Sequence, residues 1–159
     1  MMPLCLVRID DRLIHGQVVL GWARALKPDR IVIANDRIAR SAWERKFYTS
    51  SVPPHIKVSF LELEETARQL LNNLFKNEKV MVLLESVKDV YSVVELGVTL
   101  TEINIGGLHF REGAHELLPY VFLTEEDKKY LRELVKRSVA LTAQDVPGNT
   151  PQNLNSLVV

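Results

Sequence analysis

The 159-residue sequence lacks several features that mark common classes of protein. Cys5 is its only cysteine, which excludes a disulfide within the chain, and its apolar neighbours favour a buried thiol. No window holds the roughly 20 apolar residues of a membrane-spanning helix. Arg8, Asp10 and Asp11 interrupt the N-terminal apolar stretch, which is too short for a signal peptide. These absences predict a soluble, cytoplasmic protein.

An excess of charge is also missing, because 20 Lys and Arg residues balance 20 Asp and Glu residues. Without an overall field to attract a polyanion, nucleic acid is not the expected partner. The sequence contains neither a Gly-x-x-x-x-Gly-Lys-Ser/Thr loop nor a Gly-x-Gly-x-x-Gly loop, which argues against ATP and dinucleotide sites. It has no His-Glu-x-x-His motif, and the spacing of His109 and His115 matches no standard ligand set. We therefore expect neither a metal nor another cofactor.

Short runs rich in Val and Ile alternate with longer amphipathic stretches along the whole chain. The predicted strands cover residues 4–9, 30–34, 57–60, 80–84, 102–105, 120–122 and 139–143. The predicted helices cover residues 17–26, 39–50, 61–75 and 86–95, and a last helix starts at residues 124–127 with Thr124 as its cap. This alternation favours one α/β domain in three layers, with an open, mainly parallel sheet and helices on both faces.

The densest polar cluster lies where the first predicted strand gives way to a helix. Its centre is His15, followed by Gly16 and Gln17 at the start of the helical pattern. Open α/β sheets bind ligands at the carboxyl ends of their strands, and the first N–H groups of a helix attract anions. His15 could thus be a nucleophile that receives a phosphoryl group, or a helix cap among surface ion pairs.

Charged residues before His15 fit a phosphate site. Arg12 carries a fork of donors that suits phosphate oxygens, and Arg8 could act in the same way or pair with an aspartate. Asp10 and Asp11 could orient His15 or Arg12, because a carboxylate on one imidazole nitrogen leaves the other nitrogen nucleophilic. The residues alone leave these choices open.

Two other places at predicted strand ends could contribute to the site. Asn35 and Asp36 follow the second strand, where they are either ligand contacts or an ordinary turn. Gly106 and Gly107 follow a later strand, where they either let the backbone approach a ligand or partner closely or reverse the chain.

The segment Arg8-Ile9-Asp10-Asp11-Arg12-Leu13-Ile14-His15-Gly16-Gln17-Val18 resembles the signature of a bacterial protein family. The family is the IIB components of the mannose/sorbose type in the phosphoenolpyruvate-dependent sugar phosphotransferase system (PTS). The resemblance continues through Asn35-Asp36, Asn104-Ile105-Gly106-Gly107, Val121-Phe122-Leu123-Thr124-Glu125-Glu126-Asp127 and Gln144-Asp145-Val146-Pro147. It implies a single IIB domain over residues 1–159, with the active loop after the first strand.

The resemblance implies that His15 accepts a phosphoryl group from a phosphohistidine on the IIA component and passes it to a sugar. The membrane components IIC and IID would hold that sugar, and the protein would be a cytoplasmic protein-histidine phosphotransferase associated peripherally with them. Arg12 would contact the phosphate and Asp10 would order the loop. The sequence departs from the family pattern at Ser138, where a glycine is common, and at His109, which could affect partner choice or the local pKa.

Two other functions stay open on the sequence. The first is a regulatory PTS-like module that is phosphorylated in an incomplete system without sugar transport. The second is a small-molecule enzyme in which His15 is a general base. The sequence also leaves open whether two copies form a homodimer.

Overall fold

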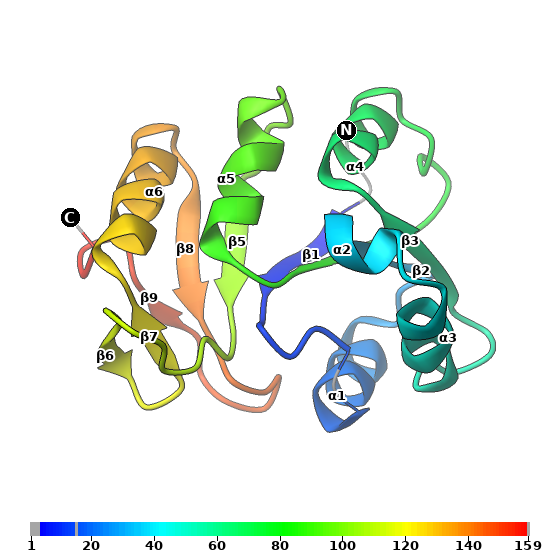
Figure 1. The fold of residues 1–159 in the computed structure, drawn as a ribbon, viewed down its shortest axis with the longest axis horizontal. Coiled ribbons are helices and arrows are strands. Elements are labelled where there is room, and N and C mark those ends of the chain that lie inside the picture. The colour runs from blue at the N-terminus through cyan, green and yellow to red at the C-terminus, as the bar shows by residue number, and fades with distance from the viewer. Residues whose placement is uncertain (1–3, 15, 159) are drawn as a thin grey trace.

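The computed structural model describes residues 4–14 and 16–158 as a three-layer α/β fold (Figure 1). Its strands are β1 (Leu4–Ile9), β2 (Arg30–Ala34), β3 (Lys57–Leu61), β4 (Val80–Leu84), β5 (Glu102–Ile105), β6 (His115–Leu118), β7 (Val121–Leu123), β8 (Ala140–Ala143) and β9 (Gln152–Asn153). Its helices are α1 (Gly16–Leu26), α2 (Asp36–Ala39), α3 (Ala42–Ser50), α4 (Leu63–Leu71), α5 (Val87–Glu95) and α6 (Glu125–Lys136).

Seven strands form the main sheet in the order β3-β2-β4-β1-β5-β8-β9. All neighbours pair in parallel except β8 and β9, which are antiparallel. The carboxyl ends of β1, β5 and β8 therefore lie side by side, and the loops that follow them meet at one edge of the sheet. A separate antiparallel hairpin, β6–β7, is held to the loop after β5 because the backbone of Leu108 hydrogen-bonds to Tyr120 and Phe122.

Alternating side chains of the central strands divide the core between the two faces of the sheet. In β2, Ile31 and Ile33 pack with α1, while Val32 and Ala34 pack on the face that α4, α5 and α6 cover. Figure 1 shows α1 and α3 on the opposite side of β1 and β2 from α4. Helices on both faces explain why the inner strands are apolar almost throughout. No helix among the described residues is long and apolar enough to cross a membrane.

The predicted fold class is confirmed, and the differences lie in element bounds and in short elements. The helix predicted over residues 61–75 is shorter, because β3 extends to Leu61 and α4 ends at Leu71. The predicted helix over residues 39–50 is α3 and begins at Ala42, because Ser41 caps its start. The short helix α2, capped by Asn35, precedes it and was not predicted. The predicted strand at residues 120–122 is shifted by one residue and belongs to the hairpin rather than to the main sheet. Strands β6 and β9 have no counterpart in the sequence analysis, since both are short and largely exposed.

The departure from the family pattern at Ser138 has a conformational meaning. Ser138 follows the end of α6 with a φ of 64°, in the left-handed region that glycine adopts with least strain. The N–H of Val139 donates to the carbonyl of Leu134, which closes the helix end in the manner of a Schellman motif. A glycine at this position would relieve strain that the serine carries.

Candidate functional site

Arg8 is a buried cation that joins three segments at the carboxyl edge of the sheet. Its side chain leaves the end of β1 and is about 1% exposed. Nη1 donates to Asn104 Oδ1 of β5 at 2.5 Å and to the carbonyl oxygen of Gln144 at 2.7 Å. Nη2 donates to the carbonyl oxygen of Asp145 at 2.9 Å. These bonds tie β1 and β5 to the loop after β8, and we call the group the Arg8 network.

The charge of Arg8 is balanced inside the protein. Nη2 also donates to Asp10 Oδ2 at 3.2 Å, and the guanidinium carbon stacks 4.9 Å from the centre of the Trp22 ring. Burial lowers the pKa of the Arg8 guanidinium, while the charge of Asp10 and its hydrogen bond oppose that effect. Of the two roles that the sequence left open for Arg8, pairing with an aspartate is the one seen. Both terminal nitrogens of Arg8 are hydrogen-bonded inside the protein, so Arg8 supports the loop that follows β1.

Asp10 is the carboxylate that links the two arginines. It is 1% exposed, and its Oδ1 accepts from the backbone N–H and from Nε of Arg12, each at 3.0 Å. Its Oδ2 accepts from Arg12 Nη2 at 3.0 Å in addition to Arg8. Burial raises the pKa of Asp10, but the hydrogen bonds from Arg12 and the charges of both arginines outweigh it and hold the pKa below its usual value. Asp10 therefore stays ionised in the folded protein at neutral pH.

Arg12 is held in one orientation while part of its guanidinium group remains accessible. Asp10 fixes Nε and Nη2, and the Asp145 carboxylate lies 3.7 Å from Nη2. The side chain is 29% exposed, and Nη1 makes no hydrogen bond to any described residue. Leu13 turns the chain beyond it with a φ of 51°, donates to the carbonyl of Asp10, and is buried against the α1 face. The buried Leu13 side chain thus anchors the chain directly after Arg12, whose guanidinium group is partly exposed.

Gly106 and Gly107 allow a close backbone approach, but to side chains of the same chain, whereas the role expected from the sequence was an approach to a ligand or partner. A Cβ atom on Gly106 would lie 2.1 Å from Nη2 of Arg8 and 2.8 Å from Oδ2 of Asp10. A Cβ atom on Gly107 would lie 3.0 Å from Nη2 of Arg12. The Gly106 N–H donates to Ile9, and the Asp11 N–H donates to the Gly107 carbonyl, at 2.7 and 2.8 Å. The missing side chains let the β5 loop pack directly on both arginines.

Asp11 pairs with His109, a partner that the sequence analysis did not identify. Its Oδ1 lies 2.7 Å from Nδ1 of His109, and its Oδ2 accepts the backbone N–H of His109 at 2.7 Å. Among the described residues Asp11 therefore orients His109 rather than Arg12. His15 lies outside the described residues, and α1 begins directly after it with Gly16 and Gln17.

Asn35 and Asp36 hold the chain at the start of α2. Asn35 is buried, and its Oδ1 accepts the N–H of Ile38 at 3.0 Å. Asp36 Oδ1 accepts the N–H of Leu63 at 2.8 Å, which joins α2 to the start of α4. No hydrogen bond in the described chain connects either residue to the Arg8 network. Asn35 thus caps a helix and Asp36 begins it, where the sequence analysis offered a turn, and a ligand contact at these residues stays a prediction.

Sequence reasoning did not assign a site role to Asn104 or Gln144. Both follow the pattern of polar residues at the carboxyl ends of parallel strands, and that signal could have identified them. Their partner Arg8 lies 96 and 136 residues away, so only the sheet order brings the three together.

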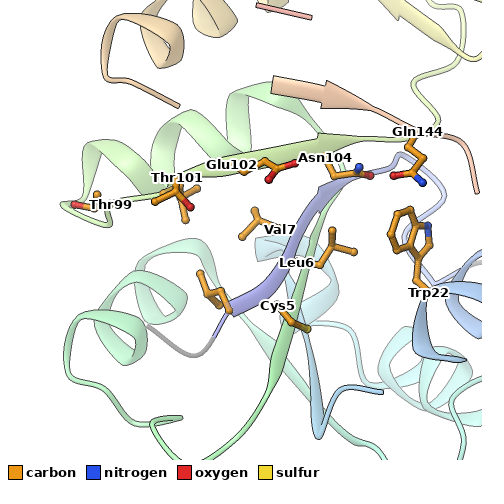
Figure 2. Close-up of a pocket in the computed structure, with 11 residues that line it drawn as sticks. Cys5, Leu6, Val7, Trp22, Thr99, Thr101, Glu102, Asn104 and Gln144 are labelled. Carbon is orange, nitrogen blue, oxygen red and sulfur yellow. The ribbon is translucent and has the colours of Figure 1, made fainter. Parts of the chain in front are cut away.

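A cavity of about 600 Å³ adjoins the Arg8 network on the side of β1 away from β4. It forms because β1 and β5 pair only through Arg8 and Ile9 and leave a gap toward their amino ends. Figure 2 shows Asn104 and Gln144 near one end of it and Trp22 beside them. Its lining includes no residue of the 10–14 or 106–109 loops, so it is separate from the exposed edge of Arg12.

Asp10→Asn is expected to lower the free energy of unfolding by about 3–5 kcal/mol, because it leaves Arg8 as an uncompensated buried charge. Asp145→Asn is the matched control, with an expected loss below about 1 kcal/mol, since that carboxylate is 41% exposed and 3.7 Å from Arg12. Urea unfolding followed by circular dichroism at neutral pH measures both. Equal losses for the two variants would contradict the role given to Asp10.

The effect of Asp10→Asn is also expected to depend on pH. The pKa of Asp10 in the folded protein lies below its unfolded value of about 3.9. The stabilisation that Asp10 provides is therefore fully present above about pH 3.9 and is lost as the pH falls through the folded-state pKa. The difference in unfolding free energy between wild type and variant should therefore narrow in acid.

Gly106→Ala is expected to destabilise the protein by at least about 1–3 kcal/mol, because the methyl group would overlap Nη2 of Arg8. Gly148→Ala is the control, since a Cβ atom there meets nothing within 4 Å, and it should change stability by no more than about 0.5 kcal/mol. Thermal unfolding of both variants measures the difference. A Gly106→Ala variant as stable as Gly148→Ala would be inconsistent with the close approach.

Comparison with known proteins shows the family to which the chain belongs. Residues 4–159 match the family model described as PTS system sorbose subfamily IIB component. The chain is 35% identical over 153 residues to the sorbose-specific EIIB component of Klebsiella pneumoniae, covering 96% of this chain and 93% of that protein. It is 31% identical over 157 residues to the mannose-specific EIIAB component of Escherichia coli K12, covering 99% of this chain and 49% of that protein.

The crystal structure of the IIBSor domain of the sorbose permease from Klebsiella pneumoniae has the same fold. It superposes with a TM-score of 0.90 at 34% identity, covering 98% of this chain and 95% of that one. The match of the family model over nearly the whole length and the shared fold together identify the family. The chain belongs to the sorbose-subfamily IIB components of the sugar phosphotransferase system.

Proposed function

We propose that this protein is the phosphocarrier of a sugar uptake system and that His15 is the residue that carries the phosphoryl group. In this proposal His15 receives the group from phosphohistidine on a IIA component and passes it to a sugar bound by the membrane components IIC and IID. The observation that supports it most directly is the orientation of Arg12, whose Nε and Nη2 are fixed by Asp10 while Nη1 has no described partner. This exposed donor belongs to the loop that carries His15.

The chemistry needs positioning and charge stabilisation more than covalent assistance. A phosphoryl group in transfer spreads negative charge over its equatorial oxygens. The Arg12 guanidinium and the first N–H groups of α1 are donors that can face those oxygens. Asp10 acts as a positioning residue, because within the described residues its carboxylate hydrogen-bonds only to Arg8 and Arg12. Preorganised donors lose little freedom when the phosphoryl group arrives.

In the transfer step, a lone pair on a His15 imidazole nitrogen attacks phosphorus in line with the bond to the donor nitrogen. The bond to the donor breaks as the new one forms, and the donor imidazole leaves with the electron pair. Because donor and acceptor are both histidine nitrogens, little free energy separates the two states and the step is reversible. Transfer to a sugar hydroxyl then releases the group in a more stable ester.

The partners are proposed from the relatives. The mannose-specific relative is an EIIAB component of which this chain spans about half, which supports a IIA domain as the phosphoryl donor. Relatives named for fructose, sorbose and mannose support a sugar as the final acceptor. We take residues 1–159 as one IIB domain that works in the cytoplasm beside the membrane components.

The His15→Ala variant is expected to lose the transfer of phosphate from phospho-IIA. Purified protein would be incubated with labelled phosphoenolpyruvate, the general PTS proteins and the cognate IIA component, and acid-labile label on it would be counted. His55→Ala, which changes an exposed histidine far along the chain, should take up label as fast as wild type. Wild-type labelling of the His15→Ala variant would disprove the assignment.

Arg12→Lys is expected to slow transfer from phospho-IIA by about 10²-fold, similar to removal of one preorganised donor of an oxyanion hole, because lysine cannot bind Asp10 and a phosphate oxygen with one planar fork. Arg137→Lys is the control, since Arg137, at the end of α6, is exposed and pairs with Glu95 of α5. Single-turnover rates measured in a rapid-quench instrument compare the variants. Equal rates for both would show that Arg12 does not face the phosphoryl group.

A further inference from the structure

Asp11 contacts both the ring and the backbone of His109. The Asp11 carboxylate binds the ring and the backbone of the same histidine, at 2.7 Å in each case. Asp11 is itself fixed, because its N–H donates to the Gly107 carbonyl at 2.8 Å. The Asp11 carboxylate accepts from the ring and from the backbone of His109, and the Asp11 N–H donates to Gly107. These three hydrogen bonds fix the ring relative to both loops.

The loop that carries His109 is also anchored. Leu108 is buried, and its N–H and carbonyl bond to Tyr120 and Phe122 of the hairpin at 2.9 and 2.8 Å. Arg111 reaches the His109 carbonyl at 3.4 Å and forms an ion pair with Asp127. His109 thus projects from an anchored loop, and its side chain is 60% exposed.

The carboxylate selects one tautomer of the ring. A carboxylate can only accept, so in the neutral form of the His109 ring Nδ1 carries the proton and donates it, which leaves the lone pair on Nε2. Nε2 makes no hydrogen bond to any described residue. An oriented, exposed imidazole with a free Nε2 lone pair is the arrangement that nucleophilic catalysis by histidine requires.

We propose that Nε2 of His109 is a second phosphoryl-accepting atom, in addition to His15. The donor is a phosphoramidate, the class of N–P compound to which phosphohistidine belongs. The Nε2 lone pair forms the new bond to phosphorus, and the donor N–P bond breaks with its electron pair going to the donor nitrogen, which takes a proton from water. The proton on Nδ1 stays in place, and the Asp11 carboxylate stabilises the positive charge that develops on the ring.

The surroundings favour an incoming phosphoryl group. The guanidinium group of Arg12 packs on Gly107, two residues before His109, and Arg111 lies two residues after it. Two arginines therefore flank the loop, and the Asp11 carboxylate contacts the Nδ1 edge of the ring, away from Nε2. The proposal shares its donor class with the proposed function but does not depend on the role of His15.

The test uses potassium phosphoramidate on the intact protein at neutral pH. Initial rates of phosphorylation at each histidine would be measured by mass spectrometry, and ³¹P NMR would identify the modified nitrogen. His55 and His115 are internal controls, because both are exposed and neither forms an ion pair with a described residue. We expect Nε2 of His109 to react at least about tenfold faster than either control, through orientation by Asp11.

Asp11→Asn removes the charge that orients the ring and should lower the His109 rate to that of the controls. Glu112→Gln is the matched variant, since it removes a carboxylate from the same loop that forms no described ion pair, and it should leave the His109 rate unchanged. Thermal unfolding would confirm that both variants are folded.

A wild-type His109 that reacts only as fast as His55 and His115 would overturn the proposal and leave an ordinary surface ion pair. An Asp11→Asn variant that is folded and reacts at the wild-type rate would overturn it as well. Because phosphoramidate needs no IIA component, either result leaves the His15 assignment to be judged by its own experiment. Conversely, failure of labelling through phospho-IIA would leave this measurement intact.

Discussion

A cation buried at the end of β1 is the constraint on which the rest of the site depends. Arg8 is withdrawn from solvent, and a buried charge is tolerated only when opposite charge and hydrogen-bond acceptors surround it. Asp10 supplies the charge, while Asn104 and the carbonyls of the loop after β8 supply the acceptors. Gly106 leaves the space that the guanidinium occupies. Three loops are thereby fixed to one side chain.

The two arginines differ in their surroundings. Arg8 lies within the network and has both terminal nitrogens engaged, whereas Arg12 keeps an edge toward solvent. Asp10 joins them, so the carboxylate that neutralises the buried Arg8 also orients the partly exposed Arg12. A site built in this way can present a preformed donor to a phosphoryl group and still remain open to large protein partners.

The sequence was sufficient for the fold because its pattern is strong where the strands are long and buried. Strand β4 is apolar at every position, and α6 begins with the capping box formed by Thr124 and Asp127. The hairpin β6–β7 and the short β9 could not be predicted, since their pairing depends on tertiary contacts and not on local periodicity. Ser138 was recognised as a departure, but only its positive φ explains it.

The site was only partly predictable for a related reason. The motif around His15 indicated phosphate chemistry and identified Arg12 and Asp10, which are neighbours in sequence. The choice between phosphate and aspartate for Arg8 depends on Asn104 and the Gln144 carbonyl, which only the sheet order brings near it. The pairing of Asp11 with His109 spans 98 positions and leaves no local signature.

The central claim is that Arg12 is the donor facing the phosphoryl group while Arg8 is its support. Nitrogen-15 NMR of the arginine side chains, recorded before and after phosphorylation of the protein, tests it most directly. The account predicts a clear change in the Arg12 guanidinium resonances and an unchanged position for those of Arg8. A change confined to Arg8, or none at Arg12, would contradict it.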